Sequence, residues 1–169
     1  MAKEAFRGEV TQKVDSKARV SIPAAFRRIL ESQDTVTEDT PRTRLYMIYG
    51  GKKRNFVECY SREGADILAA QIESMELGSV DRDRAERDLI ARSVMVDIEP
   101  DGRIVLPVKV REKMGFAEDD LKSGAEAVFV GAANRFKLYR KDVYEAADDD
   151  DDEDDVDPLA RVGRNVRVS

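Results

Sequence analysis

The fold is decided by a ten-residue stretch, VDSKARVSIP at residues 14–23, which returns as IEPDGRIVLP at residues 98–107. The two copies lie 84 residues apart, and an arginine, a proline and alternating apolar residues keep their places in both. The matched pairs include Arg19 with Arg103, Pro23 with Pro107 and Arg27 with Arg111. A repeat of this kind indicates one structural unit used twice in one polypeptide.

Each copy predicts the same local structure. A strand ends at Val14, and Asp15 opens a turn in which its carboxylate can accept hydrogen bonds from backbone amides. Residues 19–22 alternate as a second short strand. Pro23 then suits the first position of a helix, where its missing N–H costs nothing. The helix places Phe26, Ile29 and Leu30 on one face.

A hairpin follows each copy, at residues 45–60 and 127–139, and two helical segments are expected between the copies at 62–76 and 81–93. Gly115 can end the second short helix in a left-handed cap, and another helix begins near Lys141. These elements predict an α+β protein in which the order strand, turn, strand, helix, hairpin occurs twice.

Composition excludes several classes of protein. The 169 residues are 41% hydrophobic and 38% charged, and no apolar run approaches the roughly 18 residues of a membrane span. The chain has no histidine, which removes the commonest general base and metal ligand. Its one cysteine, Cys59, has no disulfide partner and alternates with Val57 as a core residue. We expect a cytoplasmic protein that is not an enzyme and uses no metal or cofactor.

Charge is distributed unevenly. Residues 145–169 hold ten acids against three arginines, a net charge of −7 that leaves +1 for residues 1–144. Residues 1–30 carry seven basic residues against three acids, a net charge of +4. The run Asp148 to Asp155 has nothing apolar to bury, so it is expected not to fold. A basic first unit beside an acidic end is compatible with a nucleic-acid partner.

At Asp15-x-x-x-Arg19-x-x-x-Pro23, and again from Glu99 to Pro107, the chain resembles the AbrB-type swapped-hairpin proteins. Two such units joined by helices are similar to the MraZ family of bacterial transcriptional regulators. Supporting matches are Phe6-Arg7-Gly8, Val130-Gly131, Asn134, Phe136 and Leu138. The resemblance covers about residues 6–144.

The resemblance implies an α+β fold in which two AbrB-like swapped-hairpin units form a small β-barrel with connecting helices. The first unit, residues 6–62, would face DNA. A helical connection would span 63–91, the second unit 92–144, and a disordered acidic tail 145–169.

The function implied by the resemblance is that of a sequence-specific DNA-binding repressor of the division and cell wall gene cluster. It would bind repeated promoter sites on double-stranded DNA as a ring-shaped homo-oligomer associated with the nucleoid. No membrane or small-molecule partner is evident. Two other readings stay open: a protein-interaction or assembly module without DNA binding, and an antitoxin-like regulator.

The candidate DNA-binding residues are Arg19, Lys17, Lys13 and Arg7. A lysine supplies a point charge for phosphate, whereas an arginine can also grip a guanine edge with two hydrogen bonds. The alternative is that Asp15 and Arg19 form only a salt bridge that serves the hairpin.

The candidate motif and turn-orienting residues are Asp15, Glu99, Arg103, Pro23 and Pro107. Glu99 stands where the family motif has Asp, so its contacts in the second turn are expected to differ. Ala18 stands where Gly is usual, so the first turn either avoids positive φ or carries strain. Arg103 has acids around it and is expected to have a structural or subunit-contact role.

Two further groups of charges keep two interpretations each. Lys52, Lys53 and Arg54 at a hairpin tip are either a second phosphate contact or a solvated turn. The acidic tail either competes with DNA for the basic unit or solubilises the protein.

Overall fold

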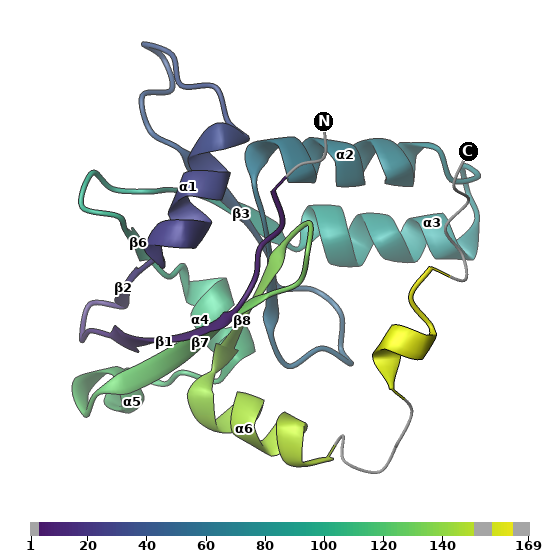
Figure 1. The fold of residues 1–169 in the computed structure, drawn as a ribbon. Coiled ribbons are helices and arrows are strands. Elements are labelled where there is room, and N and C mark those ends of the chain that lie inside the picture. The colour runs from purple at the N-terminus through teal and green to yellow at the C-terminus, as the bar shows by residue number, and fades with distance from the viewer. Residues whose placement is uncertain (1–3, 151–156, 164–169) are drawn as a thin grey trace.

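Eight antiparallel strands curl into a nearly closed barrel in the computed structural model of the protein, which describes residues 4–150 and 157–163 (Figure 1). The strands are β1 (Glu9–Val14), β2 (Arg19–Ser21), β3 (Arg44–Ile48), β4 (Val57–Tyr60), β5 (Ser93–Asp97), β6 (Arg103–Val105), β7 (Ala125–Gly131) and β8 (Phe136–Arg140). Their order around the sheet is β5-β3-β4-β8-β7-β1-β2-β6. The two strands at the ends of this order, β5 and β6, are consecutive in the chain, and the turn between them brings the sheet close to closure. The α+β prediction is confirmed.

The two halves of the chain build this barrel together. The first strand of each half pairs with the hairpin of the other, β1 with β7 and β5 with β3. The second strands pair with each other, and Val20 lies opposite Ile104, its match in the repeat. The backbone repeats this symmetry, because Ile22 N donates to Gly102 O at 3.0 Å and Leu106 N donates to Ala18 O at 2.9 Å. Neither half has a complete sheet alone.

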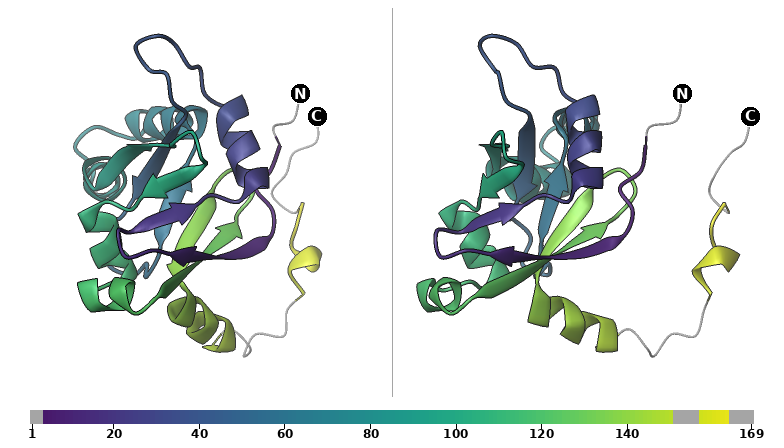
Figure 2. Two further views of the ribbon diagram at one scale, coloured as in Figure 1. Left: turned by 90° about the vertical axis from the view of Figure 1, so that its left-hand side faces the viewer. Right: turned by 60° about the vertical axis from the view of Figure 1, so that its left-hand side comes forward.

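Helices cover the outside of the barrel (Figure 2). Those within the two halves are α1 (Ala24–Ser32), α4 (Val108–Met114), α5 (Glu118–Lys122) and α6 (Lys141–Asp150). The connection between the halves is α2 (Arg62–Glu73), α3 (Val80–Ala85) and the π-helix η1 (Glu86–Ala91), which fold back on one another beside β3 (Figure 1). Ser61 and Ser79 cap α2 and α3, because each side-chain oxygen accepts a backbone N–H. None of the helices described could span a membrane.

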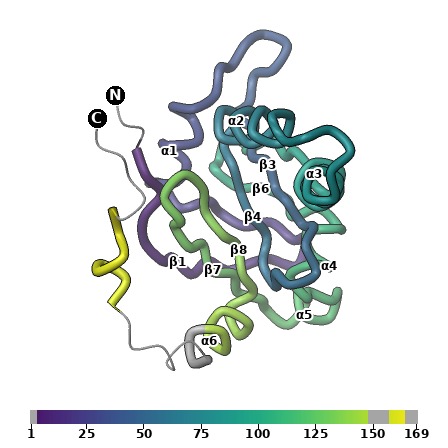
Figure 3. The backbone as a smooth tube through the Cα atoms, turned by 90° about the vertical axis from the view of Figure 1, so that its right-hand side faces the viewer, coloured from purple at the N-terminus to yellow at the C-terminus, as the bar shows by residue number. Residues whose placement is uncertain are grey.

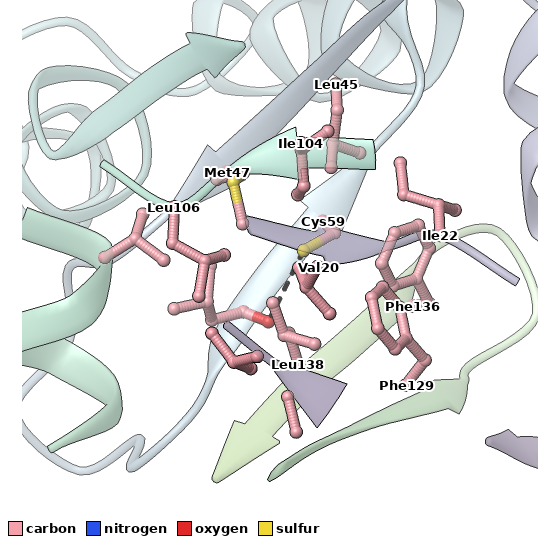
Figure 4. Packing of buried hydrophobic residues seen from close by; sticks show 14 of the residues in the cluster. Val20, Ile22, Leu45, Met47, Cys59, Ile104, Leu106, Phe129, Phe136 and Leu138 are labelled. Atoms are coloured by element: carbon pink, nitrogen blue, oxygen red, sulfur yellow. Dashed lines mark hydrogen bonds between the residues drawn. The ribbon is translucent and has the colours of Figure 1, made fainter. Parts of the chain in front are cut away.

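The barrel interior is filled by aliphatic and aromatic side chains from both halves (Figure 4). Phe6, Phe26 and Phe136 pack in edge-to-face and tilted arrangements with ring centroids 5.1–5.5 Å apart, and Phe129 lies 5.7 Å from Phe136. Cys59 is fully buried among them, so its predicted place in the core is confirmed. Truncating one of these phenylalanines to alanine would cost about 3–5 kcal/mol.

Differences from the predicted elements lie mainly near the C-terminus. Helix α6 runs from Lys141 through Asp150, so the expectation that the run from Asp148 cannot fold is wrong for its first three residues. The helix also crosses the predicted boundary at residue 145. The rest of that run up to Asp155 lies outside the described residues, and a short 3-10 helix, η3 (Pro158–Ala160), follows. Helix α5 was not predicted because five residues are too few to show helical periodicity.

Candidate nucleic-acid interface

The paired strands β2 and β6 form an arm whose two faces differ in character. Side chains alternate across a strand, so Val20 and Ile104 point into the core while their neighbours point outward. Arg19 lies opposite Val105 and Ser21 opposite Arg103. The repeat therefore places one arginine from each half on the same outer face.

The first turn is held by Asp15. Its Oδ1 accepts the backbone N–H groups of Lys17 and Arg19, each at 2.9 Å, and its Oδ2 accepts Arg19 Nε at 2.8 Å. Partial burial opposes ionisation of this carboxyl, but the hydrogen bonds from Arg19 outweigh it, so the pKa of Asp15 is lowered. Asp15 remains charged at neutral pH and fixes the direction of the Arg19 guanidinium.

Ala18 takes the left-handed conformation that its position in the turn demands. Its φ is +62°, and the matching Gly102 has a φ of +85°. Of the two alternatives for Ala18, avoidance of positive φ is wrong. The residue is fully buried and its amide donates to Asp15 O at 2.9 Å, so the surrounding turn imposes the conformation.

The second turn also holds its arginine through a carboxylate, but the carboxylate comes from a different position in the repeat. Arg103 N donates to Asp101 Oδ1 at 3.1 Å, and Arg103 Nε donates to Asp101 Oδ2 at 2.7 Å. Glu99 contributes its backbone, since Glu99 N donates to Arg103 O at 2.9 Å. No hydrogen bond or ion pair from the Glu99 side chain occurs within residues 4–150 or 157–163. The turn-orienting acid is therefore Asp101, which sequence reasoning missed, although an Asp two residues before the arginine was a usable signal.

Cations and acids meet in a shallow hollow of about 480 Å³ beside the arm. Its polar lining comes from Lys13, Asp15, Arg19, Ser21, Arg103 and Glu126. Lys13 is exposed on β1 directly opposite Glu126 on β7. The hollow is open to solvent, so a polyanion can approach both arginines.

The other candidate residues are placed as follows. Lys17 is exposed in the first turn, beside Arg19. Arg7 is also exposed, but it precedes β1 and lies at the end of that strand opposite the first turn. Lys13 and Arg19 line the same hollow, Lys17 lies in the turn between β1 and β2, and Arg7 lies at the other end of β1. Pro23 and Pro107 immediately precede α1 and α4. Each helix therefore begins one residue later than predicted.

The repeat also shows how the two turns diverge in charge. Lys13 and Lys17 of the first copy occupy the positions that Asp97 and Asp101 hold in the second. The first turn is therefore the more cationic end of the arm. Nowhere in the described chain do three or more acidic or cysteine side chains gather to hold a metal ion. The arrangement suits the binding of an anion through two oriented guanidinium groups and nearby exposed ammonium groups.

The fold and this surface define a duplicated β-barrel with a cationic two-stranded arm. No family model matches the chain. It is 45% identical over 143 residues to the transcriptional regulator MraZ of Cereibacter sphaeroides (strain KD131), a match that covers 85% of this chain and 84% of that protein. It is 37% identical over 161 residues to the transcriptional regulator MraZ of Ruegeria pomeroyi, covering 91% and 92%.

The chain belongs to the MraZ family of transcriptional regulators. The resemblance found in the repeated motif is thereby confirmed. A further relative, from Parvibaculum lavamentivorans, carries the same name at 29% identity over 141 residues.

Proposed function

We propose that the protein regulates transcription by binding double-stranded DNA through the outer face of the β2–β6 arm. The observation that carries the proposal is Asp15, which accepts two hydrogen bonds from Arg19 and one from the backbone of the exposed Lys17 and so fixes Arg19 in the turn. A guanidinium whose direction is fixed can read a base edge, because it loses little freedom on binding. The lysines position the arm on the phosphate backbone.

Repeated promoter sites and a ring-shaped homo-oligomer complete the proposal. One cationic turn per chain offers few phosphate contacts, and such modules bind DNA with dissociation constants of roughly 10⁻⁴ to 10⁻⁶ M at physiological salt. Several turns acting on repeated sites gain effective concentration, which adds on the order of 10² to 10⁴ in avidity. We propose the promoter of the division and cell wall gene cluster as the target, and repression as the result.

The test is a binding titration on the DNA upstream of the protein's own gene, followed across salt concentrations. Arg19→Gln should weaken specific binding about 10- to 100-fold, as expected for loss of one bidentate base contact. Arg28→Gln is the matched control, because Arg28 is an exposed arginine on α1 away from the arm. Oligomer mass should be the same for both variants, and binding is compared well below both melting temperatures because Arg19→Gln also loses the Nε hydrogen bond to Asp15. Equal binding by both variants would contradict the proposed role of the arm.

The number of repeats supplies a second test. A promoter fragment with three repeats should bind at least tenfold more tightly than one with a single repeat, because of avidity. Equal affinity would remove the argument for assembly on DNA. Binding to neither fragment in dilute buffer would leave a protein-interaction module as the better reading.

A further inference from the structure

A second group of cations gathers where the β3–β4 loop meets α4 and the π-helix η1. Figure 3 shows this loop beside α4. The group comprises Lys52, Lys53 and Arg54 of the loop, Arg87 of η1, Arg92 just after it, and Lys113 of α4. Lys52 and Lys53 are exposed at the tip of the loop. We call these six residues the loop cluster.

Backbone contacts hold the loop in place. Gly50 packs so closely on the carbonyl of Asp88 that a side chain at this position would overlap it. Arg54 Nη2 donates to Gly50 O at 3.0 Å, and Lys113 Nζ donates to Gly51 O at 2.6 Å. Charges on a loop fixed in this way bind a ligand without first losing much conformational entropy.

The loop cluster has more basic side chains than carboxylates that pair with them. Arg87 Nε and Arg92 Nη1 share one carboxylate oxygen, Asp88 Oδ1, each at 3.1 Å. Burial lowers the pKa of Lys113, and the neighbouring charges of Arg54 and Arg92 lower it further while Asp88 opposes them. These are the properties of a surface that attracts anions.

One buried donor in the loop cluster also lacks an acceptor. Arg54 Nε is out of contact with water and has no hydrogen-bond partner in the described part of the chain. Its Nη2 is committed to Gly50 O, so the guanidinium stays in place over the loop. Because Nε is shielded from solvent and Gly51 packs against the guanidinium, Arg54 holds the loop in place and does not itself meet a ligand.

We propose that the loop cluster is a binding site for a phosphate-bearing polyanion, separate from the arm. Lys52, Lys53 and Arg92 would meet phosphate oxygens, while Arg54 and Lys113 hold the loop. Helix α4 connects the two surfaces, because Leu106 N, just before it, donates to Ala18 O of the first turn. The seven residues of α4 span about 10 Å, so a duplex bound at the arm is close enough to reach the loop cluster, and the DNA backbone is one source of the phosphate. A free polyphosphate, such as the phosphate tail of a nucleotide, is the other source.

Titration of the full chain with inorganic tripolyphosphate at constant ionic strength tests the site. The double variant Lys52→Gln/Lys53→Gln should weaken binding about tenfold, since two charge-assisted contacts are lost. Arg28→Gln/Arg42→Gln removes the same charge from exposed positions outside the loop cluster and should bind as the parent does. Equal weakening by both double variants would overturn the proposal, because it would show only general charge attraction.

A duplex DNA titration distinguishes the two sources. If the loop cluster meets the DNA backbone, Lys52→Gln/Lys53→Gln should lower the slope of log affinity against log salt by about 2. If the slope is unchanged while tripolyphosphate binding weakens, the source is a free polyphosphate. The proposal is overturned if the variant changes neither titration. Loss of DNA binding in Arg19→Gln is independent of these outcomes, so failure here and failure of the arm can be told apart.

Discussion

Arg103 Nη1 lies 4.0 Å from Asp15 Oδ2, although 88 residues separate them in the chain. Asp15 also binds Arg19 Nε, so one carboxylate of the first copy faces arginines from both copies. The contact follows from β2–β6 pairing, which puts Arg103 and Arg19 on one face. The second arginine of the repeat therefore lies on the same face as Arg19, and its ion pair with Asp101 is compatible with the structural role expected from the sequence.

Asp15→Asn should destabilise the protein by about 1 kcal/mol at neutral pH, because amide in place of carboxylate weakens the turn hydrogen bonds. The folded-state pKa of Asp15 is lowered, so its stabilising effect is present above the unfolded pKa of about 3.9 and is lost as pH falls through the folded value. Urea unfolding of both proteins between pH 3 and pH 7 measures this. The difference between them should shrink below about pH 4, and a difference constant with pH would show that Asp15 acts only through packing.

The left-handed residues of the two turns should respond in opposite ways to substitution. Ala18→Gly relieves the positive φ but loses a buried methyl and gains unfolded-state entropy, so stability should change by less than about 1 kcal/mol. Gly102→Ala places a methyl group against the Arg27 guanidinium at a φ of +85°, which should cost about 1–2 kcal/mol. Chemical denaturation of both variants measures the contrast. Equal losses of stability in Ala18→Gly and Gly102→Ala would mean that these two positions are not equivalent in the folded protein.

Much of the fold was predictable because the signals are local. The repeated arginine and proline marked the two units, and the spacing of Phe26, Ile29 and Leu30 predicted the buried face of α1, which is confirmed. The pairing of strands across the two halves is not a local signal of this type. Strand partners separated by more than 100 residues, such as Val10 and Phe129, leave no trace in local periodicity. The resemblance alone suggested that the halves interlock.

The candidate site was partly predictable for the same reason. Asp15 and Arg19 are four residues apart, so a turn was enough to join them. Asp101 was missed because the family motif drew attention to Glu99. Only part of the loop cluster could be predicted. Lys52, Lys53 and Arg54 are consecutive in the sequence, whereas Arg92 and Lys113 come close to them only in the tertiary fold.

A buried ion pair ties the loop after α1 to the first residue of β3. Arg44 Nη2 lies 2.6 Å from Asp34 Oδ1, and the two side chains are only 12% and 1% exposed. Asp34→Ala leaves the Arg44 guanidinium buried without its partner, which should cost about 3–5 kcal/mol. Differential scanning calorimetry should show a correspondingly lower melting temperature. The exposed pair of Arg62 and Asp66 is the control, and Asp66→Ala should cost less than about 1 kcal/mol.

That pair also predicts a pH dependence. Burial opposes ionisation of Asp34, but its hydrogen bonds from Arg44 prevail, so the pKa of Asp34 is lowered. Its contribution is therefore present above the unfolded pKa of about 3.9 and is lost as pH falls through the folded value. The parent protein should lose stability steeply in that range, whereas Asp34→Ala should lose less. Parallel acid unfolding curves for the two proteins would count against the pair as the cause.

Cys59 should be unreactive in the folded protein. Burial raises the pKa of its thiol well above the usual value, and the nearby charge of Glu58 raises it further. The thiolate is the nucleophile, so an alkylating reagent at pH 8 should modify Cys59 only after unfolding. Mass spectrometry over a urea series should show modification rising with the unfolded fraction. Rapid alkylation in buffer alone would mean that the barrel opens locally at β4.

The substitution Cys59→Ser should destabilise the protein by about 1–3 kcal/mol, because a hydroxyl replaces a thiol in an apolar core.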